Sequence, residues 1–210
     1  MKKNQYTYVG ITFIILLFGI WAVPKIVNQM SGNDFAVIGQ VPAFSLTNQN
    51  GETVTNETYK GKVYVAEFFF TTCPDICPIM NRNMVKVQDK FYGNPDFGIA
   101  SFTINPKHDT SQVLKEYAEN YKVTNPNWHM LTGDKEAIYE LSNAGFHIYA
   151  QEVLDSDTVF EHSGMFALID KEGNIRSRMD ENGNPLIYYD GLDNATVQLL
   201  IEDISVLLKE

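Results

Sequence analysis

The sequence predicts an α/β domain in which strands and helices alternate, and two of its segments show this directly. The run Val63–Phe70 is rich in β-branched and aromatic residues, which is typical of a strand buried on both faces of a sheet. The segment that follows it repeats apolar residues at helical spacing, and Phe97–Ile104 then has the composition of a second strand. A chain that alternates in this way builds a sheet with helices packed against it.

Composition agrees with a globular body and excludes one class of partner. Of the 210 residues, 44% are hydrophobic and 20% are charged, which is enough apolar material for a buried core. The formal net charge is −10. A body this acidic is a poor match for phosphate backbones, so we expect no nucleic-acid partner.

The remaining elements follow in order along the chain. Pro42–Thr47 and Glu52–Thr55 flank a turn-forming stretch and predict an N-terminal β-hairpin. The later segments predict four helices and a second hairpin. The helices cover Cys73–Phe91, Thr110–Tyr121, Lys135–Asn143 and, as the closing helix, Asn194–Leu208, and the hairpin strands cover Met165–Ile169 and Asn174–Arg178. This order is that of a thioredoxin-like fold with an added N-terminal β-hairpin.

The N-terminal segment predicts one transmembrane helix before this domain. No residue between Lys3 and Lys25 is charged, and a helix needs about 20 apolar residues to cross the hydrocarbon core. Tyr6, Tyr8 and Trp21 lie where an aromatic belt would meet the membrane surface. We therefore expect residues 1–25 to form a cytoplasmic stub and anchor, residues 26–39 a tether, and residues 40–210 the thioredoxin-like domain.

A cleaved signal peptide is the alternative for this segment. It would need a small-x-small cleavage site, which the stretch Trp21–Pro24 does not offer. Lys2 and Lys3 outweigh Lys25, and the positive-inside rule therefore keeps the N-terminus in the cytoplasm. The expected location is the cytoplasmic (inner) membrane, with a single span and the soluble domain on the extracytoplasmic side, in the periplasm.

The two cysteines are the candidate chemical centre. Cys73 and Cys77 lie where the first long strand gives way to a helix, and a spacing of four residues on a helix puts both sulfurs on one face. Such a pair can form a reversible disulfide or converge on one soft metal ion. A helix N-terminus also favours the thiolate, so the spacing predicts lowered thiol pKa values.

Two structural alternatives explain the pair less well. A permanent disulfide is common outside the cytoplasm, but one that closes so short a loop removes little entropy from the unfolded chain. A zinc site needs four ligands, and no second Cys or His pair lies near these cysteines in the sequence. The pair is therefore better explained by metal binding or redox chemistry.

Phe70–Pro78 resembles the Cys-Pro-Asp-x-Cys-Pro signature of the Sco/SenC family of copper-binding, thioredoxin-fold assembly factors. Asn105–Thr110, Trp128–Gly133 and Glu161–Asp170 resemble three further segments of that family. The similarity covers most of residues 40–210. Asn105, His108 and Glu161 stand where the family usually has Asp, Arg and Asp, and none of the three is a ligand position.

The resemblance implies a function and a ligand set. Carried over by position, the copper ligands are Cys73, Cys77 and His162, and two thiolates with one imidazole suit Cu(I) or Cu(II). The implied function is that of a membrane-anchored metallochaperone that assists assembly of the dinuclear copper centre of cytochrome c oxidase. Its implied partners are the copper-bearing subunit of the oxidase and other copper carriers or thiol reductants.

Two other functions use the same thiols. A thiol–disulfide reductase would use Cys73 and Cys77 as a catalytic redox pair and keep the cysteines of the oxidase copper site reduced. A peroxidase, the weakest alternative, would use Cys73 to attack a peroxide and Cys77 to resolve the product. Only the copper site gives His162 a role, so this residue separates the three hypotheses.

Several other residues have two interpretations. Glu67 lies in an apolar strand and is either a buried acid with a raised pKa that exchanges protons with the thiols, or an edge residue paired with a lysine. We expect Met80 and Met84 to pack in the core, although a thioether is also a ligand for Cu(I). The remaining histidines are expected at the surface or in packing positions: His108, His129 and His147.

Overall fold

The structure is a computed structural model that describes residues 12, 16–23, 35–152 and 160–210. The chain divides into two compact units, Met1–Asp34 and Phe35–Glu210. Residues 16–23 of the first unit are helical. Six of their apolar side chains expose 53% to 72% of their surface: Leu16, Leu17, Phe18, Ile20, Trp21 and Val23. Within the described ranges no helix combines the length and the apolar character that a membrane span requires. Much of the expected anchor falls outside these ranges.

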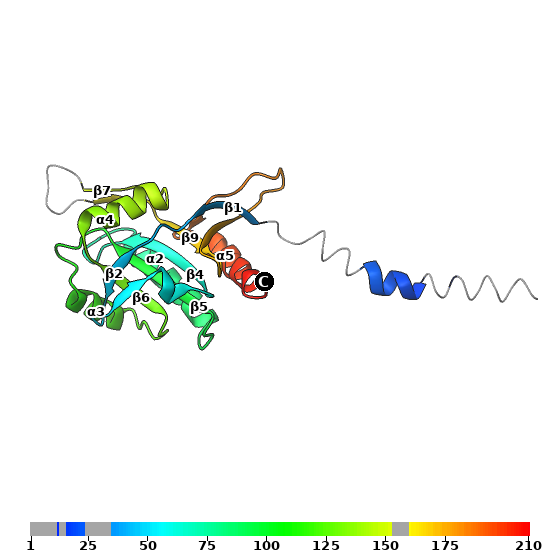
Figure 1. The fold of residues 1–210 in the computed structure, drawn as a ribbon, viewed down its shortest axis with the longest axis horizontal. Coiled ribbons are helices and arrows are strands. Elements are labelled where there is room, and N and C mark those ends of the chain that lie inside the picture. Colours follow the sequence, from blue (N-terminus) through cyan, green and yellow to red (C-terminus); the bar gives the residue numbers. More distant parts are fainter. Residues whose placement is uncertain (1–11, 13–15, 24–34, 153–159) are drawn as a thin grey trace, which may run out of the picture. The chain divides into compact units, whose positions relative to one another are not determined.

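The second unit is built on a nine-stranded mixed sheet (Figure 1). Its strands follow the order β1-β10-β9-β4-β5-β6-β2-β3, and β11 pairs with β9. The strands are β1 (Phe35–Gln40), β2 (Ser45–Asn48), β3 (Thr53–Thr55), β4 (Val63–Phe69), β5 (Phe97–Thr103), β6 (Trp128–Thr132), β9 (Met165–Ile169), β10 (Asn174–Arg178) and β11 (Tyr189–Asp190). Strands β4, β5 and β6 run parallel, and the other pairs are antiparallel. A separate two-stranded sheet pairs β7 (Ala150–Glu152) with β8 (Phe160–His162).

Helices cover both faces of the large sheet. They are η1 (Asn56–Tyr59), α2 (Cys77–Lys90), α3 (Ser111–Asn120), α4 (Lys135–Glu140), the π-helical turn η2 (Leu141–Gly145) and α5 (Asn194–Leu207). Neighbouring side chains of a strand point to opposite faces. Phe69 of β4 contacts Tyr117 of α3, whereas Phe68 contacts Phe146 after η2, so α3 and η2 lie on opposite faces. Asn81 of α2 bonds to Tyr117, and α5 contacts α2, which places both helices on the α3 face.

Strand β4 is the centre of the core. All seven of its residues are buried, which confirms the prediction of a strand covered on both faces. The aromatic rings of Phe68 and Phe102 stack across β4 and β5 with centroids 5.1 Å apart. Because β4 ends in the turn that carries the cysteines, that turn leaves a strand that is buried along its whole length.

The predicted N-terminal hairpin is confirmed as β2 and β3. Its turn is closed by the Asn48 side chain, whose Oδ1 accepts the backbone N–H groups of Asn50 and Glu52 at 2.9 Å. Gly51 has φ 79°, a conformation that glycine adopts at little cost. The second predicted hairpin is confirmed as β9 and β10, and the closing helix buries the expected stripe of apolar side chains along α5.

Five strands were not predicted, namely β1, β6, β7, β8 and β11, and one predicted helix is divided in two. Residues 35–39, expected in the tether, belong to β1 and pair with β10, while β6 pairs in parallel with β5. Both strands are stabilised by partners far away in the sequence. The predicted helix Lys135–Asn143 divides into α4 and η2.

Candidate metal centre

The turn between β4 and α2 carries the two cysteines. The expected helix start at Cys73 is wrong, because α2 begins at Cys77. Cys73 precedes Pro74, and the residue before a proline is biased away from helical geometry by a steric clash with the ring. Pro78 is the second helical residue, where its missing N–H costs no intrahelical bond. The sulfurs therefore do not share a helix face: one lies in the turn and the other in the first turn of α2.

The two thiols nevertheless meet. Both cysteines are in the thiol form, and Cys73 is partly exposed while Cys77 is buried. The pKa of the Cys77 thiol is raised well above its usual range, chiefly by burial. A hydrogen bond from the Phe70 backbone lowers this pKa, and the hydrogen-bonded Cys73 thiol raises it further. The prediction of a lowered thiol pKa is thus wrong for Cys77, because burial outweighs the helix N-terminus. A metal bound there would displace the thiol proton.

Glu67 lies beneath this turn and is fully buried. Its Oε1 accepts the Ser101 hydroxyl at 2.7 Å, and Ser101 in turn accepts Trp128 Nε1–H at 2.9 Å. Its Oε2 has no hydrogen-bond partner among the described residues. Burial raises the pKa of Glu67 to about 7, and the bond from Ser101 opposes this rise. The interpretation as a buried acid with a raised pKa is confirmed, and the edge position paired with a lysine is wrong.

A second buried acid, Asp109, holds the other side of the turn, and the sequence analysis did not single it out. Its carboxylate accepts the backbone N–H of Thr71 at 3.1 Å and the Thr71 hydroxyl. His108 Nδ1 lies 2.8 Å from Asp109 Oδ1, so the histidine that replaces the family's usual arginine pairs with this carboxylate. A carboxylate in a polar loop has no periodicity to mark it, and its burial is visible only in the fold.

The backbone of His162 lies at the same end of the sheet as the cysteine turn. Strand β9 runs antiparallel to β4 and pairs Phe166 with Glu67, so β9 begins beside the end of β4. His162 ends β8, three residues before β9, and pairs with Ala150 of β7. The structure does not describe the side chain of His162. It therefore brings the two thiols together and brings the chain at residue 162 to their end of the sheet.

The other candidate ligands have packing or surface roles. Met80 and Met84 are fully buried in the core, as expected. His129 Nδ1 lies 3.2 Å from Asn48 Nδ2, and burial lowers its pKa. Within the described residues no three His, Cys, Asp or Glu side chains gather into a cluster that could hold a metal ion.

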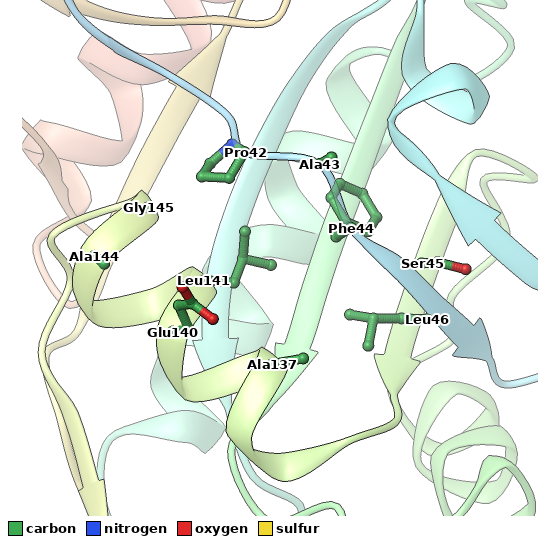
Figure 2. Close-up of a pocket in the computed structure, with 10 residues that line it drawn as sticks. All are labelled: Pro42, Ala43, Phe44, Ser45, Leu46, Ala137, Glu140, Leu141, Ala144 and Gly145. Atoms are coloured by element: carbon green, nitrogen blue, oxygen red, sulfur yellow. The ribbon is translucent and has the colours of Figure 1, made fainter.

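A cavity of about 330 Å³ lies away from the thiols (Figure 2). Figure 2 shows the segment 42–46 on one side of it and α4 with η2 on the other. Its walls are mainly apolar and include Pro42, Phe44 and Leu141, and no Cys or His lines it. The donor set for a soft metal is thus found at the end of β4 and not in this cavity.

Comparison with known proteins identifies the family. The model of the SCO1/SenC family matches residues 37–196, which is most of the chain. The chain belongs to the SCO1/SenC family. The SCO1 protein homolog of Bacillus subtilis is 32% identical over 168 residues, covering 79% of this chain and 81% of that protein.

Solved structures of SCO1/SenC proteins agree with the observed fold. BsSco, described as a member of the Sco family of cytochrome c oxidase assembly proteins with a disulfide switch, is 31% identical with a TM-score of 0.67. That match covers 81% of this chain and 94% of BsSco. Arabidopsis thaliana ScoI, solved with copper bound, is 26% identical with a TM-score of 0.61, covering 81% and 99% of the two chains. The predicted thioredoxin-like α/β fold is confirmed.

Proposed function

We propose that this SCO1/SenC protein binds one copper ion through Cys73, Cys77 and His162 and assists assembly of the dinuclear copper centre of cytochrome c oxidase. The observation that carries the proposal is the contact between the two thiols at the end of β4, with the backbone of His162 at the same end of the sheet. A relative of known structure holds copper, and another is described as an oxidase assembly protein.

The chemistry of the donor set suits copper in both common oxidation states. Thiolates are soft ligands that select Cu(I), and an added imidazole nitrogen suits Cu(II). Cys77 is buried and Cys73 is partly exposed, so the ion would be shielded on one side and open to a partner on the other. Such a site can receive and release a metal ion through its exposed side.

We also propose that residues 1–25 anchor the protein and that the tether ends before β1, so that the functional domain begins at Phe35 and not at residue 40. The uncharged run between Lys3 and Lys25 supports the anchor, as do the exposed apolar side chains of the helical residues 16–23. The positive-inside rule assigns the functional domain to the extracytoplasmic side of the inner membrane.

Thiol–disulfide reduction is a second candidate function, because two reduced thiols lie in contact. In that reaction Cys73 and Cys77 give two electrons and two protons to a partner disulfide. The partner becomes two thiols, and this protein becomes the Cys73–Cys77 disulfide. A thiol reductant of the same compartment would then restore the pair.

Copper binding to the reduced full chain in mild detergent, compared with the His162→Ala variant, separates the two functions. After dialysis against a weak copper competitor, we expect about one copper per wild-type chain and a Cu(II)–thiolate absorption band. The variant should lose Cu(II) affinity by more than about tenfold, because one of three ligands is gone. His147→Ala is a matched control that should retain the wild-type values.

The opposite result would be poor copper retention by both proteins while the thiols still reduce a disulfide substrate. In that case the copper site is rejected and the protein is a reductase. Equal, strong copper binding by wild type and His162→Ala would remove His162 from the ligand set but leave the thiol pair as the metal site.

A further inference from the structure

We infer that Asp109 is a positioning residue for the metal centre: its buried carboxylate fixes the turn that carries Cys73 by binding Thr71. The inference deepens the proposed function, since it names the group that sets the geometry of one ligand. It also concerns the metal-free thiol pair, which can be measured without copper.

The carboxylate of Asp109 joins the ends of two adjacent central strands. Its side chain is fully buried, and Oδ2 accepts the Thr103 hydroxyl at 2.5 Å and the Thr71 backbone N–H at 3.1 Å. Oδ1 accepts the Thr71 hydroxyl and lies 2.8 Å from His108 Nδ1. Thr103 is the last residue of β5, and Thr71 follows β4. The Asp109 side chain therefore links the two strands beyond the end of their backbone hydrogen bonds.

This link lies where the strand ladder ends. The backbone bond from Ile104 N–H to Phe69 O, 2.8 Å long, is at the end of the β4–β5 pairing. After it the chain enters the cysteine turn, in which the Cys73 N–H reaches Phe70 O over 3.3 Å. Two bonds from Asp109 to Thr71 thus fix the chain two residues before Cys73.

The hydrogen bonds to the Asp109 carboxylate should hold the cysteine turn rigidly. Hydrogen bonds to an ionised carboxylate are about twice as strong as neutral ones, and four donors surround this group. Loss of the carboxylate would leave the Thr71 N–H and the Thr103 hydroxyl without their acceptor in a buried setting, which is costly. The turn would then relax, and the separation and orientation of the Cys73 and Cys77 sulfurs would change.

Variants at Thr71 test the link while the buried carboxylate itself stays in place. Thr71→Val has nearly the same shape but removes the hydroxyl, and Thr71→Ser restores it. The thiol–disulfide equilibrium of the full chain is measured against a dithiothreitol buffer, together with the Cu(II)–thiolate absorption band. We expect Thr71→Val to shift the equilibrium constant by more than about threefold and to displace the band. Thr71→Ser should match wild type.

Asp109→Ala removes the whole link and is compared with a matched control. Asp170→Ala also removes a buried carboxylate, one that accepts several hydrogen bonds in the turn between β9 and β10. Both variants should lower the melting temperature, but only Asp109→Ala should shift the thiol equilibrium, by more than about tenfold.

Three outcomes would overturn the inference: an unchanged equilibrium in Thr71→Val, equal shifts in Thr71→Val and Thr71→Ser, or equal shifts in Asp109→Ala and Asp170→Ala. If Asp109→Ala fails to fold, the Thr71 pair decides alone. A wild-type protein that binds no copper rejects the proposed function and leaves the thiol measurement valid.

Discussion

The turn that carries Cys73 and Cys77 and the hairpin that carries His162 are held by the fold in different ways. The cysteine turn joins a fully buried strand of seven residues to a helix of 14 residues, and Asp109 ties it to the neighbouring strand. His162 ends a strand of three residues whose partner, β7, also has three residues. Two such short strands have little stability alone. The cysteine half of the proposed site is therefore preformed by the core. The position of the histidine half depends on the contacts that hold the β7–β8 sheet to the rest of the domain.

Among the described residues, the hydrogen bonds that attach this small sheet come from nearby segments of the chain. The Asn143 side chain binds both backbone groups of Ala150, donating to its carbonyl at 3.0 Å and accepting its N–H at 3.1 Å. On the other strand, Ser163 N–H donates to Tyr149 O at 3.3 Å. The Asn143 bonds thus connect β7, the partner strand of residue 162, to η2, which lies on the opposite face of the large sheet from α2.

The largest expected effect is the loss of Cu(I) affinity when one of the two thiols is removed. Replacing Cys73 or Cys77 by alanine should lower Cu(I) affinity on the order of 1000-fold, because a soft thiolate ligand is lost. His162→Ala should lower Cu(I) affinity far less, since both thiolates remain. Competition with a Cu(I) chelator measures both values. Met84→Leu, a volume-conserving core change, should leave the affinity unchanged. A loss of Cu(I) binding in Met84→Leu would show that Met84 is a ligand.

The buried carboxyl group of Glu67, which lies beneath the cysteine turn, can be tested through the pH dependence of stability. The folded pKa of about 7 is higher than the ordinary 4.5, so the folded protein keeps a proton that the unfolded chain releases between these values. The free energy of unfolding should fall as pH rises from about 4.5 to 7, by about 3 kcal/mol in total. Glu67→Gln should be more stable than wild type by up to that amount at pH 8, and nearly equal to it at pH 4.

Urea unfolding of the reduced protein at both pH values measures this difference. Glu57→Gln is a suitable control, because its exposed carboxylate forms only a surface ion pair with Lys60. A wild-type protein and a Glu67→Gln variant with the same pH dependence would show that Glu67 does not titrate in this range.

The smallest effect is expected in the histidine half. Asn143→Ala removes the bonds to Ala150, each worth about 1 kcal/mol or less at a partly exposed site. We expect a small loss of global stability and amide exchange that is about fivefold faster in β7, read by mass spectrometry. Exchange in β4 should not change. Faster exchange in β4 as well would show that the small sheet and the core open together.

The sequence predicted those elements whose signal is local. The β2–β3 and β9–β10 hairpins have turn-forming residues between two short strand segments, and β4 is apolar except for Glu67. Strands β1 and β6 lacked such a signal, because each is stabilised by pairing with β10 or β5. The start of α2 was misplaced because apolar spacing before the helix resembled a helical turn, although Pro74 marks Cys73 as non-helical.

The sequence identified several residues of the proposed site, but it did not predict how deeply they are buried. Cys73 and Cys77 were found from their spacing, and Glu67 from its place in an apolar strand. The raised pKa of Cys77 and the role of Asp109 depend on burial, which arises when α2 and the segment 105–110 pack onto the sheet. No pattern within the segment itself encodes that packing.

The position of β4 in the sheet has a consequence for how the protein folds as it is synthesised. One edge of β4 is completed by β9, where Val65 pairs with Leu168, about a hundred residues later in the chain. A chain made from its N-terminus has synthesised both cysteines long before this edge closes, and long-range pairing of this kind is slow. During that interval the thiols lie open to whatever oxidants surround the nascent chain. The redox chemistry of the compartment in which the protein folds therefore decides whether it starts as a dithiol, ready for copper, or as a disulfide.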